Sequence, residues 1–185
     1  YLEQTMKNHR HNLHSLAELS HVEFKTAKYI RDYLDKLGVE YETLLETATV
    51  GIIKGKNPKK TTAFRSDIDA LPSPKGAEHL CGHDGHMAAL LALAKRLKES
   101  DESFDFNILL IFQPAEEAPG GAKLLVEQGI LQKYHVEAIF GMHLMPSIDS
   151  GKIACRPGPL MAQNGELDVV IKGKSAHAGL YHLGI

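Results

Sequence analysis

Strand-like and helix-like segments alternate along most of this chain, and this order restricts the fold more than any other feature. Asn107–Gln113 is almost continuously apolar, as expected for a strand buried on both faces. A further strand is predicted at residues 61–66, another buried strand at residues 138–143, and helices at residues 87–97 and 122–128. Such alternation is typical of an α/β protein whose mostly parallel sheet carries helices on both faces.

The segment before residue 61 adds two helices and two short strands. Apolar residues recur at helical spacing within residues 6–17 and again over Phe24–Leu37, where Gly38 follows as a C-terminal glycine. Strand-like runs are predicted at residues 40–44 and 50–54.

The pattern changes after the Pro-Gly-Pro sequence at residues 157–159. Residues 166–172 partly alternate polar and apolar side chains, which predicts a half-exposed strand in a different layer. We therefore expect one domain over residues 1–163 and the beginning of a second over residues 164–185.

Composition and charge exclude several classes of protein. The chain has 185 residues, of which 43% are apolar and 24% charged, as in globular proteins with a full core. The net charge of −2 and an aromatic content of 6% argue against nucleic-acid binding. No apolar run is long enough to span a membrane. Two cysteines, Cys81 and Cys155, fit a reducing compartment, so we expect a cytoplasmic protein, although a removed leader stays open.

Eight residues from His79 to His86 contain three histidines, one cysteine and one aspartate, just before a predicted helix. Thiolate and imidazole are the ligands that zinc and its neighbours prefer. Cys81 alone would be interpreted as a small buried side chain. The density of the cluster predicts a metal site.

Polar side chains also follow each predicted buried strand. Asp67 and Asp69 come after the first, Glu116 and Glu117 after the second, and His143 ends the third. Taken singly, the aspartates could form a turn, the glutamates could complement a helix dipole, and the histidine could be an ordinary strand end. Because ligands bind outside the carboxyl ends of strands in α/β sheets, their coincidence predicts one shared site.

The adjacent carboxylates of Glu116 and Glu117 indicate two different chemical roles, metal binding and proton transfer. Two such groups repel each other unless a cation or a proton intervenes. One carboxylate could bind a metal, while the other takes a proton from the metal-activated water and delivers it to a leaving amine. Cysteine favours zinc, whereas carboxylates and histidines also accept manganese, cobalt or nickel, so one or two divalent ions are expected.

Five segments together resemble the M20 metallopeptidase family, most closely its amidohydrolase branch. That branch includes hippurate hydrolases, N-acyl-amino-acid deacylases, auxin-conjugate hydrolases and N-acetyl-diaminopimelate deacetylases. The segments are residues 64–72, 81–86, 112–122, 141–143 and 173–182. The resemblance implies a zinc-exopeptidase-like catalytic domain in residues 1–163, followed by the start of an α+β lid or dimerisation domain. It also implies metal-dependent hydrolysis of the amide bond of N-acyl amino acids or related small substrates, and a homodimer formed through the lid of the full-length protein.

The resemblance assigns a role to each motif residue. It implies that the metal ligands are Cys81, His83, Glu117 and His143. It makes Glu116 the general base and Asp69 the aspartate that orients the metal centre. Asp67 stands where other branches place a ligand histidine, and His79, Asp84 and His86 are expected beside the ligands or at the helix start.

His177 resembles the lid-domain histidine that stabilises the oxyanion. His182 matches a nearby histidine, although Tyr181 replaces the usual preceding proline. The family pattern continues beyond the lid to a final histidine ligand, so we expect the isolated 185 residues to be weakly folded or inactive. Two alternatives stay open, namely a dipeptidase or aminopeptidase with the same centre, and an inactive fragment or pseudoenzyme.

Overall fold

The computed structural model describes residues 2–57, 59–117, 120–161 and 167–184. The chain forms two compact units, residues 1–145 and residues 146–185. The boundary predicted between residues 163 and 164 lies outside the described residues, and the two-domain division of the sequence stays a prediction.

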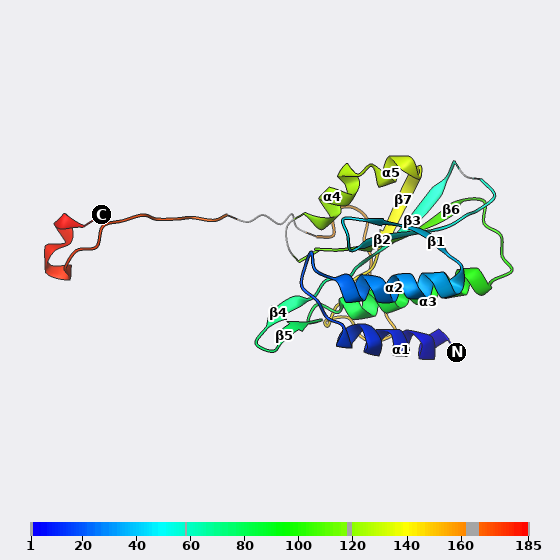
Figure 1. The fold of residues 1–185 in the computed structure, drawn as a ribbon, viewed down its shortest axis with the longest axis horizontal. Helices are drawn as coiled ribbons and strands as arrows, with labels where there is room; N and C mark the ends of the chain where they lie inside the picture. Colours follow the sequence, from blue (N-terminus) through cyan, green and yellow to red (C-terminus); the bar gives the residue numbers. More distant parts are fainter. Residues whose placement is uncertain (1, 58, 118–119, 162–166, 185) are drawn as a thin grey trace. The chain divides into compact units, whose positions relative to one another are not determined.

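The first unit is built on a mixed sheet of five strands, in the order β1, β2, β6, β3, β7 (Figure 1). The strands span Glu40–Leu44 (β1), Ala48–Ile53 (β2), Asn107–Gln113 (β6), Thr61–Asp67 (β3) and Val136–Gly141 (β7). β3 pairs in parallel with both β6 and β7, whereas β2 is antiparallel to β1 and β6. Four of these five described strands therefore point in the same direction, which confirms the predicted α/β class. A separate hairpin consists of β4 (Leu71–Ser73) and β5 (Gly76–Glu78).

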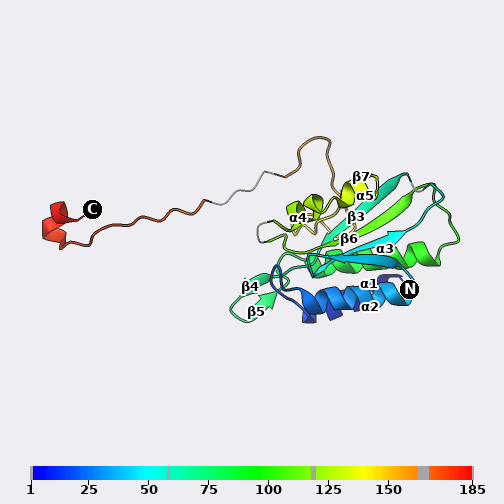
Figure 2. The same cartoon turned by 45° about the horizontal axis from the view of Figure 1, so that its top comes forward.

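Helices cover both faces of this sheet (Figures 1 and 2). One side carries α1 (Leu2–Ser15), α2 (Phe24–Leu37) and α3 (His83–Glu99), and the other carries α4 (Gly121–Glu127) and α5 (Ile130–Lys133). α2 forms because Ala27, Ile30 and Leu34 recur at helical spacing, and all three are buried. Gly38 ends α2 with a φ of 63°, a left-handed conformation that glycine adopts without steric cost.

β6 contributes side chains to the hydrophobic core on both faces of the sheet. Ile108, Leu110 and Phe112 face the cluster formed with α2 and α3, while Leu109 and Ile111 face the cluster that includes α4 and α5. Burying each of these large side chains contributes about 1.5–3 kcal/mol. β6 is therefore buried on both faces, as predicted, and it fixes the position of the residues that follow Gln113.

Three sequence-based expectations need correction. The strand predicted as buried at residues 138–143 is β7, which is an edge strand largely exposed to solvent, because within the described chain it pairs only with β3. α3 begins at His83 rather than near residue 87, since Gly82 turns the chain with a φ of 83°. Residues 167–172 form no strand, because no described segment offers them a pairing partner, and Glu166 lies outside the described residues.

The second unit contains one short 3-10 helix, η1 (Ala178–Leu183), among its described residues. Across the described part of the chain, none of the helices has both the length and the apolar character that crossing a bilayer requires.

Candidate metal centre

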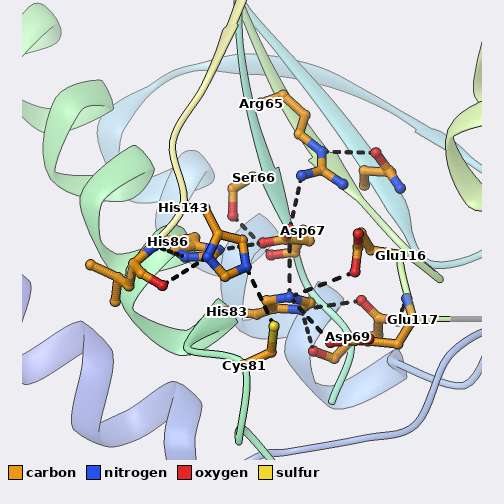
Figure 3. Close-up of polar contacts among 12 residues, drawn as sticks. Arg65, Ser66, Asp67, Asp69, Cys81, His83, His86, Glu116, Glu117 and His143 are labelled. Carbon is orange, nitrogen blue, oxygen red and sulfur yellow. Dashed lines mark hydrogen bonds and ion pairs between the residues drawn. The ribbon is translucent and has the colours of Figure 1, made fainter. Parts of the chain in front are cut away.

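The carboxyl ends of three parallel strands and the start of α3 meet at one place (Figure 3). Because β3 lies between β6 and β7, the residues that follow these strands converge. Asp67 ends β3, Glu116 and Glu117 follow β6, His143 follows β7, and His83 is the first residue of α3. The structure thus brings together residues that are up to 76 positions apart in the sequence (from 67 to 143).

His83 is the central side chain of this group. Its Nδ1 atom lies 2.9 Å from the backbone carbonyl oxygen of Asp69 and donates a hydrogen bond to it. Its Nε2 atom is buried and has no hydrogen-bond partner among the described residues. This nitrogen lies 3.7 Å from Oε1 of Glu117 and 3.9 Å from Oε2 of Glu116. A histidine whose Nδ1–H is held by a carbonyl presents Nε2 as a ligand atom, as in most metal-bound histidines.

Cys81 and His143 supply two more ligand atoms. The thiol sulfur of Cys81 lies 3.3 Å from Nε2 of His143. Nδ1 of His143 hydrogen-bonds to the backbone carbonyl oxygen of Leu144 at 2.8 Å, so His143 also presents Nε2. Ligand atoms of Cys81, His83 and His143 lie within 4.8 Å of one another, and those of His83, Glu116 and Glu117 form a second such group.

The donor set fits a divalent cation. Nε2 of His83 and Oε1 of Glu117 lie 3.7 Å apart, and both are buried without a hydrogen-bond partner in the part of the chain that the structure describes. Leaving such a group unpaired costs about 1–3 kcal/mol, which a cation between them would offset. One thiol, two imidazoles and carboxylates form a set that zinc and its transition-metal neighbours accept.

Negative groups crowd this site. Burial raises the pKa of the Cys81 thiol to about 12, and the hydrogen bond and the charge of Glu117 act in the same direction. Burial, followed by the charge of Glu117, also raises the pKa of Glu116. A bound cation would oppose these effects and favour the thiolate.

Asp69 connects the end of β3 to residues 114–117, the loop after β6 that carries Glu116 and Glu117 (the glutamate loop). Its Oδ2 atom accepts hydrogen bonds from the Ser20 hydroxyl at 2.6 Å and from the backbone N–H of Glu117 at 2.9 Å. Burial acts to raise the pKa of Asp69, but the nearby Nδ1 of His83, 3.4 Å from Oδ1, and the hydrogen bonds from Ser20 and the glutamate backbone outweigh it and lower this pKa to about 2. The carboxylate is therefore ionised at neutral pH and fits the orienting role implied for Asp69.

Asp67 and His86 form a connection that the sequence analysis missed. Nδ1 of His86 lies 2.7 Å from Oδ1 of Asp67, whose Oδ2 accepts a hydrogen bond from Arg65 at 2.8 Å. Nε2 of His86 accepts a hydrogen bond from the backbone N–H of Leu144 at 2.9 Å. His86 therefore holds the chain beside His143. The i, i+3 spacing of His83 and His86 on one helix face was the available signal.

Residues 63–181 match peptidase family M20/M25/M40 over more than half of the chain. The chain belongs to this family. An uncharacterized hydrolase of Staphylococcus haemolyticus is 42% identical over 182 residues, covering 91% of this chain and 47% of that protein. An N-acetyldiaminopimelate deacetylase of Listeria monocytogenes is 37% identical over 187 residues, covering 94% of this chain and 50% of that protein. The chain thus spans about half the length of the curated relatives it matches.

A solved M20 structure has the same fold. The crystal structure of a dinuclear metal-binding peptidase of the M20 family from Bacillus subtilis superimposes with a TM-score of 0.72 and 36% identity. The match covers 79% of this chain and 44% of that one.

The other residues singled out in this M20 chain have different surroundings. Asp84 turns toward α1, where His14 lies 2.8 Å and Arg10 3.4 Å from its Oδ2 atom. His79 is buried, and neither of its ring nitrogens has a hydrogen-bond partner among the described residues. His177 lies in the second unit, where its Nδ1 accepts a hydrogen bond from the backbone N–H of Gly179. The oxyanion role implied for His177 stays a prediction.

Proposed function

We propose that this protein is a metal-dependent amidohydrolase that cleaves the amide bond of N-acyl amino acids or related small substrates. The observation that carries the proposal is the unequal placement of two neighbouring carboxylates beside Nε2 of His83. The side chain of Glu117 is 22% exposed, whereas that of Glu116 is 41% exposed. The inner carboxylate is suited to holding a cation, and the outer one to meeting substrate.

Cys81, His83, Glu117 and His143 would hold one or two divalent ions, with zinc, manganese, cobalt or nickel as candidates. Such an ion lowers the pKa of water and polarises the substrate carbonyl. Asp69 keeps His83 and the backbone of Glu117 in place through its backbone carbonyl and its carboxylate.

Glu116 moves the proton. Its raised pKa brings the carboxyl closer to the range in which a group both accepts and donates a proton near neutral pH. Glu116 takes a proton from the attacking water as the water oxygen bonds to the acyl carbon. It then gives this proton to the amide nitrogen as the carbon–nitrogen bond breaks. The products are a carboxylate and a free amine.

The proposal also covers the substrate class, the oxyanion-stabilising residue, the oligomeric state and the location of the protein. The Listeria relative named N-acetyldiaminopimelate deacetylase supports an N-acyl amino acid as the substrate class. We include in the proposal His177 as an oxyanion-stabilising residue, a homodimer formed through the lid domain of the full-length protein, and a cytoplasmic location, which two unpaired cysteines support.

A substrate panel tests the proposal. The metal-loaded full-length protein is expected to release amine from N-acetyl or N-benzoyl amino acids faster than from dipeptides. Faster cleavage of dipeptides would assign the centre to a dipeptidase or aminopeptidase. Absence of turnover on every compound, with the metal bound, would indicate a pseudoenzyme.

A further inference from the structure

Glu23 is a fully buried carboxylate, 0% exposed, at the start of α2. Its Oε1 atom accepts hydrogen bonds from the backbone N–H of Ala115 at 2.9 Å and of His21 at 3.0 Å. Its Oε2 atom accepts a hydrogen bond from the Thr47 hydroxyl at 2.9 Å. Glu23 thus reaches, across 92 positions of sequence, the residue that directly precedes Glu116.

Ala115 has an uncommon backbone conformation. Its φ is +50°, in the left-handed region that residues with a Cβ atom rarely adopt. Its carbonyl oxygen accepts a hydrogen bond from the backbone N–H of Gly121 at 3.3 Å. A Cβ atom at Gly121 would lie 1.9 Å from the carbonyl oxygen of Pro114, so the loop passes tightly against the start of α4. Ala115 is therefore held from both sides.

The conformation of Ala115 sets the direction of the two glutamates that follow. Glu117 is itself anchored, because its N–H donates to Asp69. The loop thus has one carboxylate anchor before Glu116 and one after it. If Ala115 relaxed to a negative φ, the chain would leave β6 in another direction, and Glu116 and Glu117 would lose their placement beside His83.

The other partners of Glu23 also lie in left-handed segments. His21 has a φ of 67°, and Leu45 and Glu46, just before Thr47, have φ values of 48° and 62°. Four of the five described non-glycine residues with positive φ therefore belong to segments that Glu23 contacts. Such conformations persist only where surrounding groups hold them, and they concentrate near functional sites.

We propose that Glu23 is a positioning residue for the metal centre. Its carboxylate acts as a hydrogen-bond acceptor that holds Ala115 in the left-handed conformation and so directs Glu116 and Glu117 toward His83. This inference rests on the metal-binding part of the proposed function, and it adds a residue outside the strand-end motifs.

A pair of substitutions separates hydrogen-bond geometry from size. In Glu23→Gln, the amide oxygen can accept from both backbone N–H groups, and the amide nitrogen can donate to the Thr47 hydroxyl oxygen. In Glu23→Met, the side chain has similar length but cannot accept a hydrogen bond from the N–H of His21 or of Ala115. Titration of metal-free protein with Co²⁺ alone, followed by visible absorption, should show affinity near that of the original protein for Glu23→Gln. Glu23→Met should lose about 10–100-fold, the range typical of residues that support metal ligands.

Glu18→Met is the matched control. The Glu18 carboxylate also accepts backbone hydrogen bonds, from the N–H groups of Lys25 and Thr26, but these partners belong to α2 and not to the glutamate loop. This variant should lose stability while its Co²⁺ affinity and spectrum stay unchanged.

Ala115→Gly tests the mechanism directly. Glycine adopts a φ of +50° at no steric cost, so adding Ala115→Gly to Glu23→Met should restore much of the lost Co²⁺ affinity. In the unaltered metal-free protein, hydrogen exchange at the Ala115 N–H should be as slow as at the amides of β6. This last measurement needs no variant to fold.

Four results would overturn the inference: original affinity in Glu23→Met, equal loss in Glu23→Gln and Glu23→Met, no recovery with Ala115→Gly, or fast exchange at Ala115. If the Co²⁺ results are as expected but no N-acyl amino acid is cleaved, the proposed reaction fails and the role of Glu23 stands.

Discussion

At the scale of single residues, Asp69 connects three parts of the centre. It bonds His83, Ser20 and the backbone of Glu117. In Asp69→Asn, the amide oxygen can replace Oδ2 only if the amide nitrogen takes the place of Oδ1, which lies 3.4 Å from Nδ1 of His83. Two N–H donors would then face each other, and the negative charge beside His83 would be lost. We expect zinc affinity, measured by competition with a chromogenic chelator, to fall about 10–100-fold.

Asp84→Asn is the control for this change. Asp84 is also buried and adjoins His83 in sequence, but its side chain faces His14 and Arg10. Its substitution should leave zinc affinity unchanged. Equal losses in the two variants would show that Asp69 acts through general stability rather than through its bonds to the centre.

Membership of the site could be predicted from sequence only for residues that directly follow a recognisable strand or lie in the His79–His86 cluster. Asp67, Asp69, Glu116, Glu117 and His143 were found because each follows a recognisable strand, and parallel strands bring their ends together. Glu23 was missed because Ala115 lies 92 positions away and no pattern marks their contact. The Asp67–His86 pair was missed because the i, i+3 spacing of His83 and His86 places both on one helix face without showing which residue of β3 they meet.

At the scale of elements, α1 depends on a histidine that must stay neutral. His9 is buried against α2, with its Nδ1 2.8 Å from the Tyr29 hydroxyl, and burial lowers its pKa to about 4. The unfolded chain binds a proton near pH 6.5, so the folded state loses stability as the pH falls from about 6.5 to about 4. This loss amounts to about 3 kcal/mol.

Urea unfolding of metal-free protein across this pH range checks the prediction. His9→Phe should remove the part of the pH dependence that His9 contributes, while keeping the packing against Tyr33. His11→Phe, an exposed position on the same helix, should leave the pH dependence as it was. An unchanged slope in His9→Phe would contradict the account.

The types of β6, β7 and α2 were predictable because sequence pattern is local, whereas the exposure of β7 was not. β6 and α2 agree with the prediction because β6 is a short, almost continuous apolar run and the apolar residues of α2 repeat with the period of a helix. β7 has an apolar sequence too, but its exposure depends on which elements cover it, and that is a tertiary property. The start of α3 was displaced by the left-handed Gly82, which no hydrophobic pattern reveals.

At the scale of the whole first unit, the centre joins segments that follow three strands, so an ion bound there should stabilise the fold. An ion at 100 times its dissociation constant adds about 2.7 kcal/mol if it binds only the folded state. Thermal unfolding with and without zinc should show this gain, and a chelator should reverse it. Cys81→Ser should reduce the gain, whereas Cys155→Ser, an exposed cysteine of the second unit, should retain it.

At this scale, charge and aromatic content argued against a nucleic-acid-binding protein, and the motifs indicated the family to which residues 63–181 belong. The division into domains was harder to predict from sequence, because it depends on contacts between distant segments. The chain also spans only 47–50% of its matched relatives.

The most direct test of the central claim is Glu116→Gln, measured for both turnover and metal content. The amide cannot take a proton from water, so hydrolysis of an N-acyl amino acid should fall by about 10²–10⁴-fold. Metal content should stay that of the original protein, because Cys81, His83, Glu117 and His143 are unchanged. Unchanged turnover would contradict the role of Glu116 as the base, and loss of the metal would show that Glu116 is a ligand instead.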